Sequence, residues 1–120
     1  MTGKLTTHVL DTAQGIPVPG LTIELWLMNS SSGEKTLLKT TTTNQDGRTD
    51  APLLADDELK PGIYELVFVM GRYLAQNLNS LPNPMFFDRI PIQFGVADTA
   101  VHYHVPLLVS PYSYSTYRGS

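Results

Sequence analysis

A stretch of strict alternation, from Leu21 to Met28, constrains the fold of this chain more than any other feature of the sequence. Every second side chain there is leucine or isoleucine, and the side chains between them are threonine, glutamate, tryptophan and methionine. In an extended strand, a period of two puts all the aliphatic side chains on one face. We therefore predict a half-buried strand over residues 21–28, with its aliphatic face against a core.

Further short extended segments recur along the chain. They are rich in β-branched and aromatic residues and are divided by turns that contain Gly, Pro, Asn or Asp. One segment, residues 71–78, has good helix formers instead and predicts a short helix. Pro91 predicts an edge strand or a bulge, because proline donates no ladder hydrogen bond. The predicted strands cover residues 6–11, 36–43, 63–70, 86–94, 101–109 and 112–117.

Several short strands, frequent turns and almost no helix predict an all-β protein. The expected architecture is a two-sheet antiparallel β-sandwich with Greek-key-like connections. A chain of 120 residues has the size of one domain, so we expect residues 1–120 to form a single domain. Charged residues make up only 16% of the sequence, which is low for a soluble domain and suggests that part of the surface is used in contacts between copies.

Composition also limits the partners and the compartment. The formal net charge of -3 gives no electrostatic reason to bind nucleic acid or an anionic membrane. No segment reaches the apolar length of a membrane span, and the first residues lack the apolar stretch of a secretory signal. The absence of cysteine is compatible with a reducing compartment. We expect a cytoplasmic protein, with the periplasm and the peroxisome left open.

Histidines are the residues best suited to carry chemistry here. His102 and His104 are two apart in a predicted strand and therefore share a face, while the opposite face carries the core side chains. Their face continues with Pro106 and Leu108, which predicts a cavity or a subunit contact. A structural histidine pair is the ordinary alternative. A zinc site with His8 is another, but no carboxylate or thiolate spacing completes a metal motif, so we predict no required metal and treat any bound zinc as adventitious.

The usual acyl-enzyme nucleophiles are either missing from the sequence or carry no recognisable motif. There is no Gly-x-Ser-x-Gly motif and no cysteine, so a hydrolysis would need activated water. A neutral imidazole, with a pKa of about 6.5, can take a proton from that water. Arg48 directly follows an Asp-Gly turn, and its permanently charged, planar group suits carbonyl oxygens and developing negative charge.

Four segments resemble the transthyretin-related 5-hydroxyisourate hydrolases. They are residues 5–11, 46–48, 102–108 and the terminal 112–120. The similarity extends over essentially the whole chain, and a terminal Tyr-Arg-Gly-Ser combined with two separate histidine segments is a specific combination. The resemblance implies a transthyretin-like fold that assembles as a homotetramer, a dimer of dimers, with the active sites in the channel between the dimers.

The resemblance also implies roles for individual residues. His8, Arg48, His104 and Ser120 would be catalytic, and His8, Arg48 and Tyr117 would bind substrate, while His102 would have a supporting role or none. The implied reaction needs no cofactor: hydrolysis of 5-hydroxyisourate, which opens the cyclic amide to 2-oxo-4-hydroxy-4-carboxy-5-ureidoimidazoline in urate degradation. Spacing does not decide which histidine is the general base, because closely interacting groups titrate as a pair.

A transthyretin-like carrier that binds a small ligand in the central channel is the alternative. Residues 110–116 resemble the carrier as well as the hydrolases. A carrier, however, has no use for His8, His104 and a polar terminal segment around a channel that should be largely apolar. We therefore expect an enzyme.

Overall fold

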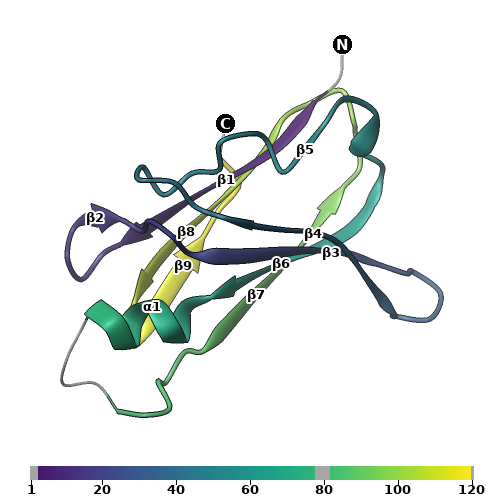
Figure 1. Cartoon of the computed structure of the whole chain (residues 1–120). Coiled ribbons are helices and arrows are strands. Elements are labelled where there is room, and N and C mark those ends of the chain that lie inside the picture. Colours follow the sequence, from purple (N-terminus) through teal and green to yellow (C-terminus); the bar gives the residue numbers. More distant parts are fainter. Residues whose placement is uncertain (1–2, 78–81, 120) are drawn as a thin grey trace.

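Two sheets pack against each other in the computed structural model, which describes residues 3–77 and 82–119 (Figure 1). The first sheet has the order β2 (Ile16–Pro17), β1 (Lys4–Asp11), β8 (Tyr103–Ser110), β9 (Ser113–Thr116), and β5 (Leu54–Ala55) also pairs with β1. The second sheet has the order β4 (Lys35–Thr42), β3 (Thr22–Met28), β6 (Gly62–Val69), β7 (Arg89–Val96). A 3₁₀ turn, η1 (Asp56–Glu58), follows β5, and the helix α1 (Met70–Asn77) follows β6. The predicted all-β sandwich with one short helix is confirmed.

Strand β3 has the two faces that its alternation predicts. Ile23 and Leu25 are completely buried in the core between the sheets. Glu24 and Trp26 are half-buried on the opposite, outer face of the second sheet. Neighbouring strands β4 and β6 both run antiparallel to β3. The aliphatic face therefore stabilises the sandwich, and the mixed face is left for polar contacts.

Strands β1 and β8 form the central pair of the first sheet, and they run parallel, with Thr6 opposite His104. All the other described strand pairs are antiparallel. This pair departs from the antiparallel arrangement that we predicted. Alternation shows which side chains are buried but carries no information on strand direction. A parallel pair needs a long crossover, and here most of the chain forms it: β1 and β8 lie at opposite ends of the sequence but side by side in space (Figure 1).

Strand β7 lies at the edge of the second sheet, where Pro91 is tolerated as predicted. Its inward side chains include Ile90 and Val96, both almost fully buried. The predicted strand began at residue 86, but β7 begins at Arg89. The residues before β7 instead join an aromatic cluster at the end of the first sheet. The cluster consists of Phe86, Phe87, Tyr112 and Tyr114.

Helix α1 corresponds to the helix predicted over residues 71–78, of which residue 78 lies outside the described part of the chain. Met70 and Leu74 are completely buried. The Tyr73 hydroxyl donates a hydrogen bond of 3.1 Å to the Asp11 carboxylate at the end of β1. Burial, that hydrogen bond and the Asp11 charge raise the pKa of Tyr73 to about 12. The contact fastens the helix to the first sheet.

Candidate functional site

The loop after β4 lies against β1 and presents Arg48. Asn44 shapes this loop, because its side-chain oxygen accepts hydrogen bonds from the backbone N–H groups of Asp46 (2.9 Å) and Arg48 (3.2 Å). Gly47 has a φ of 76°, a conformation that favours glycine. Its carbonyl accepts a hydrogen bond of 2.8 Å from the N–H of Val9, and a side chain at position 47 would collide with the Val9 carbonyl. The loop is therefore tied to β1 directly beside His8.

His8 is half-buried on the outer face of β1. Its Nε2 lies 2.8 Å from the backbone oxygen of Asp46. A carbonyl oxygen can only accept a hydrogen bond, so Nε2 must carry the proton and donate it. In the neutral ring, the unprotonated nitrogen is then Nδ1. This hydrogen bond both orients the ring and selects its tautomer.

His104 lies on the outer face of β8, opposite Thr6 in the parallel register. A hydrogen bond of 2.8 Å joins its Nδ1 to the Thr6 hydroxyl. Burial lowers the pKa of His104, and the charges of Arg48 and His8 lower it further, while a hydrogen bond with the Thr6 backbone acts in the opposite direction. The electrostatic effects of Arg48 and His8 indicate that these three predicted site residues form one cluster. His104 is consequently neutral at neutral pH and able to accept a proton.

A small cavity of about 200 Å³ lies next to this cluster. Thr6, Thr7 and Arg48 line it, together with residues 49–52 of the segment that follows Arg48. The Arg48 side chain makes no ion pair with any residue in the described ranges. Its charge is therefore available to a ligand. Imidazoles beside a guanidinium that makes no ion pair can bind and polarise a planar, carbonyl-rich ring.

The chain end returns to His104. Gly119 donates a backbone hydrogen bond of 2.7 Å to the His104 carbonyl and forms an isolated bridge with it. A side chain at position 119 would put its Cβ 2.5 Å from Cδ2 of the His104 ring. Only glycine allows this approach without moving the ring. Arg118 lies over the ring of Tyr103, with its Cζ 4.6 Å from the ring centroid.

Three other residues stand apart from this cluster. His102 is exposed, and its Nδ1 accepts a hydrogen bond of 3.1 Å from the N–H of Lys4, a contact that supports the end of the strand pair. Tyr117 is 60% exposed and lines a separate groove of about 410 Å³ between β7 and β9, so one copy of the chain does not bring it to the Arg48 cavity. Ser120 lies outside the described residues.

Sequence reasoning missed Thr6 and Asn44. Thr6 has the same strand parity as His8, so its position on the histidine face could have been predicted. Asn44 begins the turn before Arg48, and asparagine often bonds to backbone groups two residues on. Within the described ranges, no group of three or more His, Cys, Asp or Glu residues is placed to hold a metal ion. No described helix is long and apolar enough to cross a membrane.

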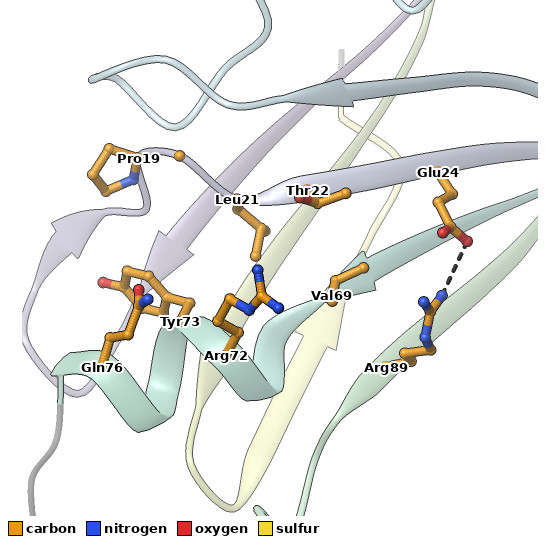
Figure 2. Close-up of a pocket in the computed structure, with 10 residues that line it drawn as sticks. Pro19, Leu21, Thr22, Glu24, Val69, Arg72, Tyr73, Gln76 and Arg89 are labelled. Carbon is orange, nitrogen blue, oxygen red and sulfur yellow. Dashed lines mark hydrogen bonds and ion pairs between the residues drawn. The ribbon is translucent and has the colours of Figure 1, made fainter.

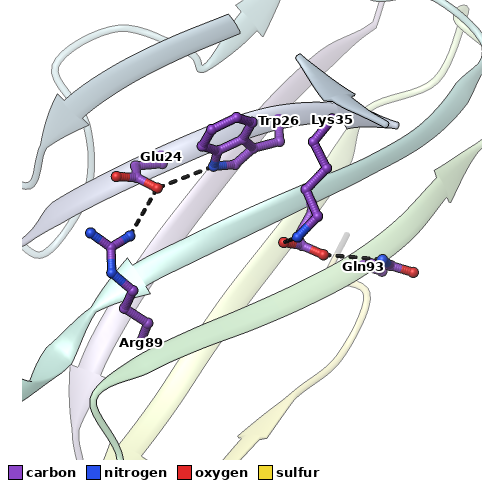
Figure 3. Close-up of polar contacts among 6 residues, drawn as sticks. Glu24, Trp26, Lys35, Arg89 and Gln93 are labelled. Atoms are coloured by element: carbon purple, nitrogen blue, oxygen red, sulfur yellow. Dashed lines mark hydrogen bonds and ion pairs between the residues drawn. The ribbon is translucent and has the colours of Figure 1, made fainter. Parts of the chain in front are cut away.

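The outer face of the second sheet has hollows of its own. One of about 220 Å³ lies between α1 and the start of β3, with Arg72 and Arg89 in its wall (Figure 2). Arg89 is already paired with Glu24 at 3.1 Å. Beside it, Glu65 accepts hydrogen bonds from Lys35 (2.8 Å) and Gln93 (3.0 Å). Figure 3 shows Lys35 and Gln93 on this face, together with the contacts of Glu24 with Trp26 and Arg89. This face contains paired charges and no histidine, so it is a poorer candidate for hydrolysis.

Comparison with known proteins gives a consistent family. The model of the HIUase/Transthyretin family matches residues 5–119. The 5-hydroxyisourate hydrolase of Mesorhizobium japonicum is 59% identical over 98% of this chain and 93% of its own length. The enzyme of the same name from Pseudomonas aeruginosa is 52% identical over 98% of this chain and 92% of its own length.

Solved structures agree with this result. The Klebsiella pneumoniae 5-hydroxyisourate hydrolase superposes with a TM-score of 0.77 at 34% identity, over 98% of this chain and 99% of that one. An (S)-allantoin synthase gives a TM-score of 0.92 at 42% identity and covers 99% of this chain, which spans only 44% of that protein's chain. Transthyretin from Sparus aurata shares the fold. It superposes with a TM-score of 0.84 at 22% identity, over 97% of this chain and 96% of its own. The chain belongs to the HIUase/Transthyretin family.

Proposed function

We propose that this chain, acting as one hydrolase domain, hydrolyses 5-hydroxyisourate to 2-oxo-4-hydroxy-4-carboxy-5-ureidoimidazoline in urate degradation, without a cofactor. The proposal rests on relatives of that name that are more than half identical to this chain over nearly its whole length. The observation that carries it is the cluster of His8, His104 and Arg48 beside a small cavity. Its groups match the needs of a water-dependent ring opening.

In the proposed mechanism, a neutral imidazole takes a proton from water as the water oxygen bonds to the cyclic amide carbon. The unprotonated nitrogen of His8 or of His104 is suited to this step. The carbonyl oxygen becomes negatively charged, and the Arg48 guanidinium stabilises it. As the tetrahedral intermediate collapses, the C–N bond breaks and an imidazolium returns a proton to the leaving nitrogen. The carboxylic acid so formed then loses its proton to solvent.

We assign Tyr117 to substrate binding and Ser120 to catalysis. Gly119 contacts His104 directly, and Ser120 is the next residue in the sequence. Tyr117 lines a groove at the β7 and β9 edges in a single copy of the chain. Its predicted contact with substrate therefore depends on the arrangement of subunits around the site.

We further propose a homotetramer, a dimer of dimers. β7 and β9 are edge strands, and ladder groups on an edge are available to pair with another copy. The exposed rings of Phe86 and Tyr112 lie at the end of these strands. The outer face of β8 adds Leu108, which is half-buried and lies beyond the histidines. These apolar groups suit contacts between subunits.

A carrier function remains the alternative, since a transthyretin of known structure is bound to thyroxine and shares this fold at 25% identity and a TM-score of 0.84. Fold alone does not fix function. Two hydrogen-bonded imidazoles and an unpaired arginine on one face favour catalysis over the storage of a largely apolar ligand.

The proposal is tested with 5-hydroxyisourate generated in situ from urate and urate oxidase, whose decay is followed by ultraviolet absorbance. The wild-type chain should accelerate the decay, and His8→Ala, Arg48→Ala and deletion of Ser120 should abolish most of that acceleration. Sedimentation should show that each variant keeps the oligomeric state of the wild type. A wild-type rate equal to that in buffer would overturn the enzyme proposal and favour the carrier.

A further inference from the structure

We propose that Thr6 is a positioning residue for the hydrolysis: it holds His104 in the tautomer whose Nε2 is unprotonated, and Gly119 fixes the ring from another side. This inference rests on the proposed function, because it defines which nitrogen of His104 is available as a base. Thr6 itself does not need to touch the substrate.

Register places Thr6 next to His104. The two residues are direct partners in the parallel pairing of β1 and β8, and both side chains lie on the outer face. The Thr6 hydroxyl oxygen is 2.8 Å from Nδ1, a full-strength hydrogen bond between half-buried groups. Because threonine has few χ1 rotamers, its hydroxyl is a stiff partner.

The effect of the Thr6 backbone on the pKa of His104 indicates whether Nδ1 donates or accepts the hydrogen bond with Thr6. A hydrogen bond with that backbone raises the pKa of His104, which requires an accepting group, because a backbone N–H would favour the neutral ring. The Thr6 backbone therefore favours a ring that donates. Nδ1 is the ring nitrogen that lies 2.8 Å from the Thr6 hydroxyl, so a proton on Nδ1, donated to that oxygen, agrees with both contacts and leaves Nε2 with its lone pair.

Gly119 restricts the ring at a different atom. Its Cα lies so close to Cδ2 that an added Cβ would stand 2.5 Å from that carbon. Cδ2 is bonded to Nε2, so the chain end packs beside the nitrogen that Thr6 leaves unprotonated. The ring is held at Nδ1 by a hydrogen bond and at Cδ2 by backbone contact, with little freedom to flip.

His8 has the opposite tautomer. The Asp46 carbonyl requires a proton on its Nε2, which leaves Nδ1 unprotonated. The charges that act on His104 are those of Arg48 in the loop and His8 on β1. His102 lies two residues before it, and Arg118 donates a hydrogen bond of 3.3 Å to the His102 carbonyl. With each ring held by a different partner, the two imidazoles offer one defined base nitrogen each.

The test compares Thr6→Val, which removes the hydroxyl at nearly constant shape, with Thr6→Ser, which keeps it. Thr12→Val is the matched control, because the Thr12 hydroxyl donates a hydrogen bond of 3.2 Å to the Val109 carbonyl at the other end of the same strand pair, away from the cavity. Nitrogen-15 NMR of the imidazole, above its pKa, reports the tautomer without any substrate. We expect a protonated Nδ1 in the wild type, Thr6→Ser and Thr12→Val, and a mixture of tautomers in Thr6→Val.

Kinetics on 5-hydroxyisourate should follow the tautomer. We expect Thr6→Val to lower kcat by roughly tenfold or more with a smaller change in KM, and Thr6→Ser to restore most of it. Thr6→Val keeps the backbone contact that raises the pKa of His104, so a lower kcat in this variant reports the lost hydroxyl. Thr12→Val should keep its kcat.

A second pair of variants tests the chain end. Gly119→Ala should displace the His104 ring and change its NMR signals, whereas Gly95→Ala should not, because a Cβ there meets Ile63 at an ordinary 3.5 Å. A protonated Nε2 in the wild type, or an unchanged tautomer and kcat in Thr6→Val, would overturn the inference. A wild type with this tautomer but no activity would instead overturn the proposed function alone.

Discussion

On the outer face of the second sheet, Glu24 and Glu65 each accept hydrogen bonds from two side chains, whereas on the outer face of the first sheet His8 and His104 each engage one ring nitrogen. Both faces belong to the same sandwich and hold ionisable groups. The difference lies in how many hydrogen-bonding atoms of each group remain available to a ligand. A fully paired charge stabilises the fold but offers nothing to a ligand, while a half-paired imidazole is oriented and still reactive.

The largest effect should come from removing the charge of the histidine face. Arg48→Ala should lower kcat/KM by about 10²- to 10³-fold, the range found when one group that stabilises an oxyanion is lost. Its stability should stay within about 0.5 kcal/mol of the wild type, since Arg48 is exposed. Arg89→Met, on the other face, is the control. Equal loss of activity in both variants would remove the distinction between the faces.

As the pH falls, the activity that depends on the histidine face should be lost before the stability that depends on the face with Glu65. Burial, Arg48 and His8 lower the pKa of His104 below its usual 6.5, so activity that needs the neutral ring persists to below pH 6.5 and is lost as the pH falls through that lowered pKa. Burial alone would raise the pKa of Glu65, but hydrogen bonds from Lys35 and Gln93 and the Lys35 charge hold it below its usual 4.5.

The stability that Glu65 contributes is therefore complete above pH 4.5 and lost as the pH falls through its lowered pKa. The unfolded chain also binds a proton at His104 more readily than the folded chain does, so a small loss of stability begins below pH 6.5. Rate measurements and circular dichroism over the same buffers should show activity disappearing before structure. Coincident transitions would mean that unfolding, and not His104, limits the rate.

A smaller and purely structural effect is expected from Lys35→Met. Glu65 would keep only Gln93 as a side-chain partner while its carboxylate stays 5% exposed. Because Lys35 is itself 45% exposed and solvent screens the pair, the loss should be about 1–2 kcal/mol, less than for a fully buried pair. Urea unfolding measures the stability, and kcat should not change. A drop in kcat at full stability would show that this face takes part in catalysis.

Arg89→Met should have the smallest effect. The Arg89 side chain is 55% exposed in its pair with Glu24, so the change in free energy of unfolding should be about 0.5 kcal/mol or less. Glu24 still accepts a hydrogen bond from Trp26 at 3.1 Å, which limits the cost. Fluorescence of Trp26 should report the local change. A loss above about 1.5 kcal/mol would show that the outer network acts cooperatively.

The sequence predicted the histidine face better than the paired face, for a physical reason. Strand parity places Thr6, His8 and His104 on one side of their strands, and the Asp-Gly turn marks the loop that presents Arg48. Contacts between Glu65, Lys35 and Gln93 depend on the register of three strands, which alternation does not determine. The tautomer of His8 could not be predicted from the sequence either, because it depends on the Asp46 carbonyl, which is 38 residues away in the chain.

The parallel pairing of β1 and β8 has a consequence for how activity arises in time. Thr6 and His104 are 98 residues apart in sequence, so they meet only after nearly the whole chain has been ordered between them. Closing so long a loop is slow and entropically costly, and native contacts of this separation tend to form late. Catalysis would then be the last property that a refolding chain acquires. Half of the chain on its own could not hold both histidines, so recovered activity is a measure of completed folding.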